Sequence, residues 1–445
     1  MMYNVKCYYI LIICKKQVRI EYKRKESGFM KMKRVATGLC ALMMVFGGAV
    51  VPAVPIGMDT VVNASADSVY GSFNYIVFGD NTVEITGYNG SAANVSVPSS
   101  INGKTVVSIG KYAFDNNHSV KSVTLPSTIK SIGICAFFYC ANLQSINLPS
   151  GLKEIKEEAF MNCISLRSVA MPNTVTKLES SAFCGCESLS SLTISSGLKA
   201  IPDYAFEECG ALRNVTVPSG VTKLGIHAFG KCKGLESISL PSTLTFIGAN
   251  AFYLCSRLKS ISLPDNITSI EANTFIDCVG LASVKFPSKL KEISIDAFNG
   301  CISLRNVQLP SSLTTIWYDA FYGCTAMGTV TIPKSVTKIS PDALGFYDNG
   351  KIKGFKMRVY KGSAAEQYAK ENGLAYEVIS TASKSKGDIN GDGSVNVSDI
   401  SKVAAHIKGK KTLGTSNKAD LNGDGRVNVS DISLLSAYVK GKKKF

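Results

Sequence analysis

The chain has 445 residues, 45% of them hydrophobic, which suffices for two or three domains with sizeable cores and excludes a wholly disordered protein. Its 49 basic and 33 acidic residues give a net charge of +16, but the surplus is too dispersed to form a nucleic-acid-binding stripe. The three histidines, His118, His227 and His406, share no ligand spacing, which argues against a histidine-based metal site or nucleophile.

The first 66 residues have the layout of an export signal. A basic run at 30–34 precedes an apolar stretch at 35–54, and Ala64-Ser65-Ala66 offers a small-residue cleavage site. Residues 1–29 fit no part of this layout. We therefore interpret 1–66 as a start site placed too early followed by a signal peptide. The mature chain is expected to be secreted and not inserted in a membrane after cleavage.

A period of 23 residues governs the middle of the chain, 97–345. Ten phenylalanines keep this step without exception, from Phe114 to Phe321, and most units also keep a proline. Residues 143–148 have the L-x-x-I-x-L pattern of a leucine-rich-repeat strand. One unit cannot bury its own apolar face, so the units are expected to stack as an α/β solenoid, with a short helix or 3₁₀ turn at 132–140 opposite the strand.

Nine cysteines share the same period. They are Cys140, Cys163, Cys186, Cys209, Cys232, Cys255, Cys278, Cys301 and Cys324. Their number is odd, and equivalent positions in stacked units present parallel thiols, whereas metal and redox sites need converging ones. We predict a ladder of buried free thiols.

These units resemble the BspA-type leucine-rich repeats of bacterial surface proteins. The resemblance covers about 95–345 through the pattern L-P-x-x-[LIV]-x-x-I-x-x-x-A-F-x-x-C-x-x-L-x-S-[IV]. It implies a leucine-rich-repeat fold with adhesion or ligand binding in place of catalysis. The flanking segments are expected to be an N-terminal capping hairpin at 67–96 and a C-terminal cap at 346–380.

The outward positions of the expected strands are small, polar and almost uncharged. They are Ser145/Asn147, Ser168/Ala170, Ser191/Thr193, Asn214/Thr216, Ser237/Ser239, Ser260/Ser262, Ser283/Lys285, Asn306/Gln308 and Thr329/Thr331. Such a face either suits tightly stacked strands or offers hydrogen bonds to a protein or glycan ligand. The single dense aromatic group is Trp317, Tyr318 and Tyr322, a candidate platform for a sugar.

A linker at 381–386 leads to two near-copies, DINGDGSVNVSDIS from Asp388 and DLNGDGRVNVSDIS from Asp420. Both fit the EF-hand calcium-loop pattern D-x-N-x-D-G. The expected ligands at positions 1, 3, 5, 7, 9 and 12 are Asp388, Asn390, Asp392, Ser394, Asn396 and Asp399, then Asp420, Asn422, Asp424, Arg426, Asn428 and Asp431. All six acidic residues of 387–445 fall at position 1, 5 or 12. We predict two calcium ions.

A duplicated loop followed each time by a helix, at 387–445, resembles a type I dockerin. The resemblance implies binding to a cohesin module of a cellulosome scaffoldin or a cell-surface anchor. It places the cohesin contacts at positions 10 and 11 and further along each helix. Here these are Val397, Ser398, Ala404, Ala405, Val429, Ser430, Ser436 and Ala437.

Taken together, the sequence predicts a secreted, non-catalytic, cellulosome-associated binding or adhesion protein. No G-x-S-x-G or H-E-x-x-H motif occurs, and no stretch is left for a catalytic domain. Two alternatives stay open. The repeats could be a spacer without a ligand, or the chain could be a carbohydrate-active component that takes part in polysaccharide catabolism.

Overall fold

The protein is described from a computed structural model. The described residues are 68–348, 350–379, 386–390, 394–409, 413 and 419–441. The predicted early start and signal peptide, at 1–66, lie outside the described residues, as does most of the linker at 381–386. Within the part of the chain that the structure describes, no helix is both long and apolar enough to cross a membrane.

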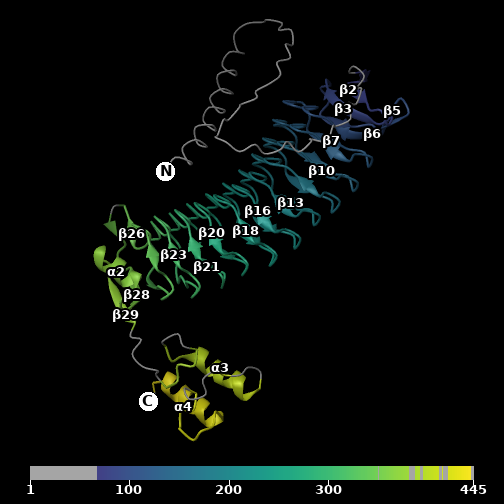
Figure 1. Ribbon diagram of the computed structural model, residues 1–445. Coiled ribbons are helices and arrows are strands. Elements are labelled where there is room, and N and C mark those ends of the chain that lie inside the picture. The colour runs from purple at the N-terminus through teal and green to yellow at the C-terminus, as the bar shows by residue number, and fades with distance from the viewer. Residues whose placement is uncertain are drawn as a thin grey trace, which may run out of the picture. The chain divides into compact units, whose positions relative to one another are not determined.

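The repeats stack so that equivalent strands lie side by side (Figure 1). One set of strands, the first ladder, contains the predicted leucine-rich-repeat strands. It consists of β4 (Asn94–Ser96), β7 (Ser122–Thr124), β9 (Ser145–Ile146), β11 (Ser168–Ala170), β13 (Ser191–Thr193), β15 (Asn214–Thr216), β17 (Ser237–Ser239), β19 (Ser260–Ser262), β21 (Ser283–Lys285), β24 (Thr329–Thr331), β28 (Lys356–Tyr360) and β29 (Tyr376–Ile379). Paired strands are parallel and in register at the repeat step, as in Ser168↔Ser191. The predicted stack of leucine-rich-repeat units is confirmed.

A second ladder of short parallel strands, which the sequence analysis did not predict, runs beside the first. It consists of β6 (Lys104–Ile109), β8 (Ser131–Ile132), β10 (Glu154–Ile155), β12 (Lys177–Leu178), β14 (Ala200–Ile201), β16 (Lys223–Leu224), β18 (Phe246–Ile247), β20 (Ser269–Ile270), β22 (Glu292–Ile293), β23 (Thr315–Ile316) and β25 (Lys338–Ile339). Each of these strands ends on a branched aliphatic residue that is mostly buried.

The segments after the second ladder are turns, so the helix or 3₁₀ turn expected at 132–140 is not observed. The reason lies in the backbone. Each unit places a residue with positive φ just before its alanine–phenylalanine pair and another four residues after the first, as at Cys135 and Tyr139. Left-handed residues cannot continue a right-handed helix. The two left-handed positions therefore turn the chain and aim the phenylalanine inward.

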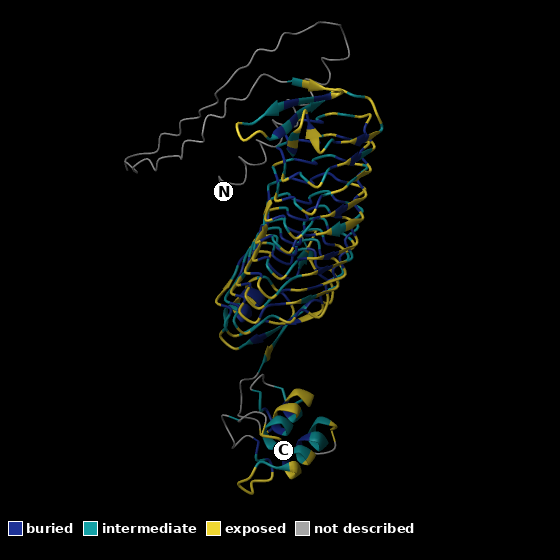
Figure 2. Cartoon of the chain, turned by 90° about the vertical axis from the view of Figure 1, so that its right-hand side faces the viewer, coloured by how far each residue is buried: buried dark blue, intermediate teal, exposed yellow. Residues whose placement is uncertain are grey.

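Two columns of side chains fill the interior of the stack, which Figure 2 shows as buried along its length. Consecutive phenylalanines from Phe114 to Phe321 stack with ring centroids 4.8–6.1 Å apart. The nine ladder cysteines are buried and free, as predicted. Each thiol donates a hydrogen bond to the carbonyl of a phenylalanine one unit back, with S···O distances of 3.0–3.3 Å. Every unit is thus tied to the one before it.

Irregular elements flank the repeats. At the start, β1 (Ser68–Tyr70) pairs with β2 (Phe73–Val77), which forms a hairpin with β3 (Val83–Tyr88), and β5 (Ser100–Ile101) pairs with β6. At the other end, β26 (Phe346–Tyr347) and β27 (Gly350–Lys351) precede β28. The helix α2 (Ala364–Glu371) lies between β28 and β29 in the chain. These elements cover the two apolar ends of the phenylalanine column, through Tyr88 and Tyr368 among others.

The C-terminal module contains two helices, α3 (Val397–Ile407) and α4 (Val429–Val439). The helices contact each other around a small core of Val403, Ala419, Leu421 and Leu435. Each helix follows one of the two D-x-N-x-D-G segments, and the two are 32 residues apart.

Candidate functional site

The second D-x-N-x-D-G loop is held in shape by its first aspartate. Asp420 Oδ1 accepts hydrogen bonds from the N–H groups of Gly423 at 2.7 Å and Asp424 at 3.1 Å, and its Oδ2 accepts one from Gly425 at 2.8 Å. Gly425 has a φ of +80°, at the sixth position where the loop must turn sharply. One carboxylate thus folds the loop around itself.

Positions 3 and 5 of this loop contact each other. Asn422 Oδ1 accepts from the Asp424 N–H at 2.9 Å, while Asn422 Nδ2 donates to Asp424 Oδ2 at 2.7 Å. The hydrogen bond from the Asn422 side chain, with a second from the Arg426 N–H, lowers the pKa of Asp424. Asp424 is therefore a carboxylate at neutral pH.

Position 12 is a fully buried aspartate in both halves. Asp431 Oδ1 accepts from the N–H groups of Leu421 at 2.7 Å and Asn422 at 3.2 Å, and its Oδ2 accepts from Asn428 at 2.9 Å. Asn428 is the N-cap of α4, and its side chain accepts from the Ser430 N–H. Positions 9 and 12 thus form a capping box, so the same residues both begin the helix and face the loop.

The first loop repeats this arrangement. Asp399 Oδ1 accepts from the N–H groups of Ile389 and Asn390 at 2.8 and 2.9 Å, and its Oδ2 accepts from Asn396, the N-cap of α3, at 2.9 Å. Asp388 is buried, and Ser394, at position 7, is partly buried. Asp392, the expected ligand at position 5, lies outside the described residues.

The predicted donors around each loop are oxygens of carboxylates, amides and backbone carbonyls, which is the donor set that Ca²⁺ prefers. A carboxylate oxygen that accepts one hydrogen bond retains a lone pair for a cation. Among the described residues, no three histidine, cysteine, aspartate or glutamate side chains gather closely enough to form a metal site by themselves. A calcium ion here would depend on the amide and backbone oxygens as well as the carboxylates.

The predicted cohesin contacts occupy equivalent places in the two halves. Val397 is 65% exposed and Val429 is 66% exposed, although both are apolar and begin a helix. Ser398 and Ser430 are exposed beside them and accept hydrogen bonds from the amides of Asn390 at 2.6 Å and Asn422 at 2.9 Å. The four further residues are partly buried: Ala404, Ala405, Ser436 and Ala437.

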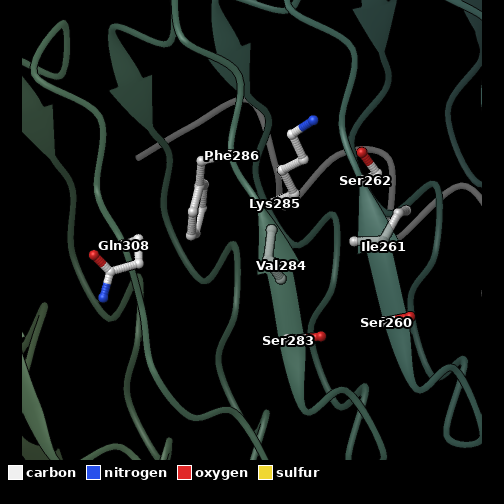
Figure 3. A pocket seen from close by; sticks show the side chains of 8 residues that line it. All are labelled: Ser260, Ile261, Ser262, Ser283, Val284, Lys285, Phe286 and Gln308. Carbon is white, nitrogen blue, oxygen red and sulfur yellow. The ribbon is translucent and has the colours of Figure 1, made fainter. Parts of the chain in front are cut away.

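The repeats present a second surface, the outward side of the first ladder. Two adjoining hollows of about 510 and 450 Å³ lie on it. The larger is lined by Ser260, Ser283, Lys285, Phe286 and Gln308 among others, and Figure 3 shows Gln308 set apart from Phe286. Here the ladder is interrupted, because 306–308 forms no strand and only a bridge from Gln308 to Thr331 remains.

The repeat pattern does not predict this hollow. Two signals in the sequence mark it: Phe286 stands where other units have a smaller aliphatic residue, and Lys285 is the one charge among the outward strand positions. The break itself follows from the left-handed backbone of Asn306, with a φ of +50°. That conformation is not encoded by the repeat pattern.

The aromatic group at Trp317 is engaged in local contacts. The indole N–H donates to Glu292 at 3.3 Å, and the ammonium of Lys338 lies 3.7 Å from the ring centroid. Both partners come from neighbouring units at the same position of the repeat. Since one ring face is covered by a cation, Trp317 is poorly suited to stack on a sugar.

Known protein families match both the repeats and the C-terminal module. The BspA-type leucine-rich repeat region matches 107–236 and 222–353, and the type I dockerin domain matches 386–440. A leucine-rich cell surface protein from Faecalibacterium prausnitzii is 29% identical, with 68% of this chain and 97% of that chain covered and a TM-score of 0.43. A leucine-rich-repeat protein from Bacteroides ovatus is 24% identical, with 70% and 99% covered and a TM-score of 0.46. No curated protein matches the sequence.

The two matched kinds of domain have known general properties. Type I dockerins imply a cohesin partner in a cellulosome-type assembly and in general bind calcium, and leucine-rich repeats suggest a binding surface. Neither kind of domain is catalytic, and both are typical of extracellular or surface-associated proteins. The chain belongs to the BspA-type leucine-rich-repeat family and carries a C-terminal type I dockerin domain.

Proposed function

We propose that the protein is a secreted, non-catalytic component of a cellulosome-type assembly. Its dockerin binds a cohesin in a calcium-dependent way, and its repeats present a recognition surface to a protein or glycan. The observation that carries this proposal is the pair of equivalent loop–helix halves, each with an exposed valine at the start of its helix. The proposed division of the chain is the predicted one, with a signal peptide within 1–66, repeats at 97–345 between two caps, and the dockerin at 387–445.

Two calcium ions are proposed, one in each loop. Asp388, Asn390, Asp392, Ser394, Asn396 and Asp399 would hold the first, and Asp420, Asn422, Asp424, Arg426, Asn428 and Asp431 the second. Within the second loop, the carboxylates of Asp420 and Asp424 and the amide of Asn422 are held by hydrogen bonds to the loop backbone and by one between Asn422 and Asp424. Mutual repulsion of these carboxylates disfavours the loop without a cation, so calcium is expected to stabilise the module.

The calcium loop and the cohesin face share residues. The amide of Asn422, proposed at position 3, donates to the hydroxyl of Ser430, proposed as a cohesin contact, and Asn390 does the same for Ser398. An ion that fixes Asn422 also fixes the hydroxyl beside Val429. This gives a physical route by which calcium organises the binding face.

The two halves supply a sharp test. Val397→Asp and Val429→Asp each place a charge on one half, and each is expected to weaken cohesin binding only a few-fold, because the other half can take its place. The double variant is expected to lose at least 100-fold in affinity, measured by isothermal titration with a panel of type I cohesins in calcium.

The matched control is Val69→Asp, which makes the same substitution at a valine that is 68% exposed on β1, and it should bind cohesin like the parent. Unchanged affinity of the double variant would remove these valines from the proposed interface.

A further inference from the structure

A column of basic residues runs along one edge of the first ladder. It occupies the position directly before each strand of the first ladder, or before 306–308 where the ladder is interrupted, and between 121 and 305 it is basic in every second unit. We name the following five residues the basic column: Lys121, Arg167, Arg213, Lys259 and Arg305. The units between them carry Gln144, Ser190, Glu236 and Ala282 at this position.

Backbone hydrogen bonds show that these positions lie directly over one another. The N–H of Gln144 donates to the carbonyl of Lys121 at 2.8 Å, Arg167 donates to Gln144 at 3.2 Å, and Ser190 donates to Arg167 at 3.0 Å. The same bonds continue from Glu236 to Arg305. Since neighbouring strands are about 4.8 Å apart, successive members of the column stand about 10 Å apart along the stack.

The charges of the column are available to a ligand. All five residues are exposed. Within the described part of the chain, Arg213 is the member that forms an ion pair, with Glu236 at 3.1 Å. The other four have no carboxylate within ion-pair distance among the described residues. An exposed row of like charges, four of the five without a counter-charge, attracts anions over about a Debye length, ~8 Å at physiological salt.

The surface beside the column is rich in hydrogen-bonding groups and poor in acids, since Asp265 is the one acidic residue among those that line the two hollows. The outward positions of the first ladder are mostly serine, threonine and asparagine, and Lys285 adds a further positive charge next to the two hollows. Figure 3 shows the hydroxyls of Ser260 and Ser283 on neighbouring strands, and Ser260 directly follows the column member Lys259 in the sequence. Exposed aromatic rings suited to stacking are not found on these outward positions.

We propose that this edge of the repeats binds a linear polyuronate, a 1,4-linked acidic polysaccharide with one carboxylate on each sugar. The proposal rests on the recognition role of the repeats proposed above and names its substrate class. Sugars of an extended 1,4-linked chain repeat at about the spacing of neighbouring strands, so every second carboxylate meets a basic side chain. Arginine and lysine pair with these carboxylates, and the hydroxyls and amides between them bond to sugar hydroxyls.

The spacing favours this polymer over other ligands. Duplex DNA carries one charge per ~1.7 Å of axis, far denser than the basic column. Side chains on one face of an acidic peptide strand repeat at ~6.7 Å, which does not match a step of about 10 Å. A neutral glucan has no carboxylates to pair with the basic side chains, and its recognition usually relies on stacking against exposed aromatic rings.

The test compares binding of soluble oligogalacturonates, long enough to span three column members, to the full chain and two variants. The column variant replaces four residues by glutamine: Lys121→Gln, Arg167→Gln, Lys259→Gln and Arg305→Gln. The matched control makes the same loss of charge at exposed lysines that precede strands of the second ladder: Lys130→Gln, Lys153→Gln, Lys199→Gln and Lys291→Gln.

The parent and the control are expected to bind within twofold of each other, and the column variant at least tenfold more weakly. Methyl-esterified oligogalacturonates, which keep the backbone and lose the charge, are expected to bind at least tenfold more weakly to the parent, and higher salt should weaken binding. Circular dichroism on all three proteins checks that each is folded.

Equal binding of the column variant, no binding by the parent, or tighter binding of duplex DNA would overturn the polyuronate assignment. Column-independent binding of a neutral glucan would overturn it too, while leaving a recognition role for the repeats. Cohesin binding, measured on the same preparations, reports separately on the dockerin, so failure of one proposal is distinguishable from failure of the other.

Discussion

At the residue scale, the stack depends on residues whose backbone adopts the left-handed conformation. Each unit places two residues in the left-handed region, and only three of the second set of positions are glycine: Gly185, Gly300 and Gly323. A side chain in this conformation costs about 1–2 kcal/mol relative to glycine. The repeats accept this cost many times, because the turns it creates bring the phenylalanine and cysteine columns into the core.

Gly323→Ala should destabilise the protein by about 1–2 kcal/mol. Gly323 has a φ of +71°, and an added Cβ would meet only ordinary contacts at 3.4 Å or more, so the cost is that of the backbone conformation. Gly328→Ala is the matched control, since it has open space around it and no left-handed φ. Urea unfolding measures both, and equal effects would refute the argument.

Because the thiols of the cysteine column are buried, the free energy of unfolding is expected to depend on pH in the alkaline range. Burial raises the pKa of Cys140 from 9.0 to about 12, because the thiolate is desolvated in the core. The unfolded chain releases this proton near pH 9 and the folded chain does not, so stability is full below pH 9 and is lost as pH rises toward 12. Above pH 9, the free energy of unfolding of Cys140→Ala should therefore fall less steeply with pH than that of the parent. The two slopes should differ by about 1 kcal/mol per pH unit. Parallel slopes in urea unfolding at pH 8 to 10 would contradict this.

At the scale of elements, the two loop–helix halves combine a cap and a proposed ion site. Asp431 accepts hydrogen bonds from three backbone N–H groups, and these belong to the start of the loop and to Asn428, the N-cap of α4. The helix can therefore begin without an ion, while the carboxylates of the loop still repel one another. Asp431 is therefore both a helix-capping residue and a proposed calcium ligand.

Asp431→Asn is expected to weaken calcium binding at least tenfold and to lower the stability of the module by about 1–3 kcal/mol, because an amide cannot accept all three bonds. Calorimetric titration with calcium and thermal unfolding of the full chain, with and without chelator, measure the two effects. Asp342→Asn, at an exposed aspartate in the repeats, is the control. A variant that binds calcium normally would remove position 12 from the proposed ligand set.

The sequence predicts the first ladder, the free-thiol column and the two halves of the dockerin, because each follows from a strict period or a strict motif. The second ladder is not predicted because all of its strands after β6 have only two residues, as in Glu154–Ile155, too short for an alternating pattern. The turns at 132–140 were mistaken for a helix or 3₁₀ segment because left-handed residues such as Cys135 and Tyr139 have no distinct residue type. The basic column was likewise overlooked, since its period is two units and not one.

At the scale of the whole molecule, the proposed functions are divided between the repeats, which would bind a ligand, and the dockerin, which would attach the protein to a cohesin. The repeats build one long stack in which each unit stabilises the next, and they offer an extended surface along the first ladder. The dockerin has its own small core and its own exposed apolar residues. Attachment and recognition are therefore expected to be separable by substitutions in one region that leave the other unaffected.

The most direct test of this account is the affinity of the full chain for a panel of type I cohesins, measured by isothermal titration in calcium and again with excess chelator. The account predicts at least one cohesin bound in calcium, with a loss of at least 100-fold on chelation and full recovery when calcium is restored. An affinity that is unchanged by chelation would contradict the proposed calcium-dependent docking.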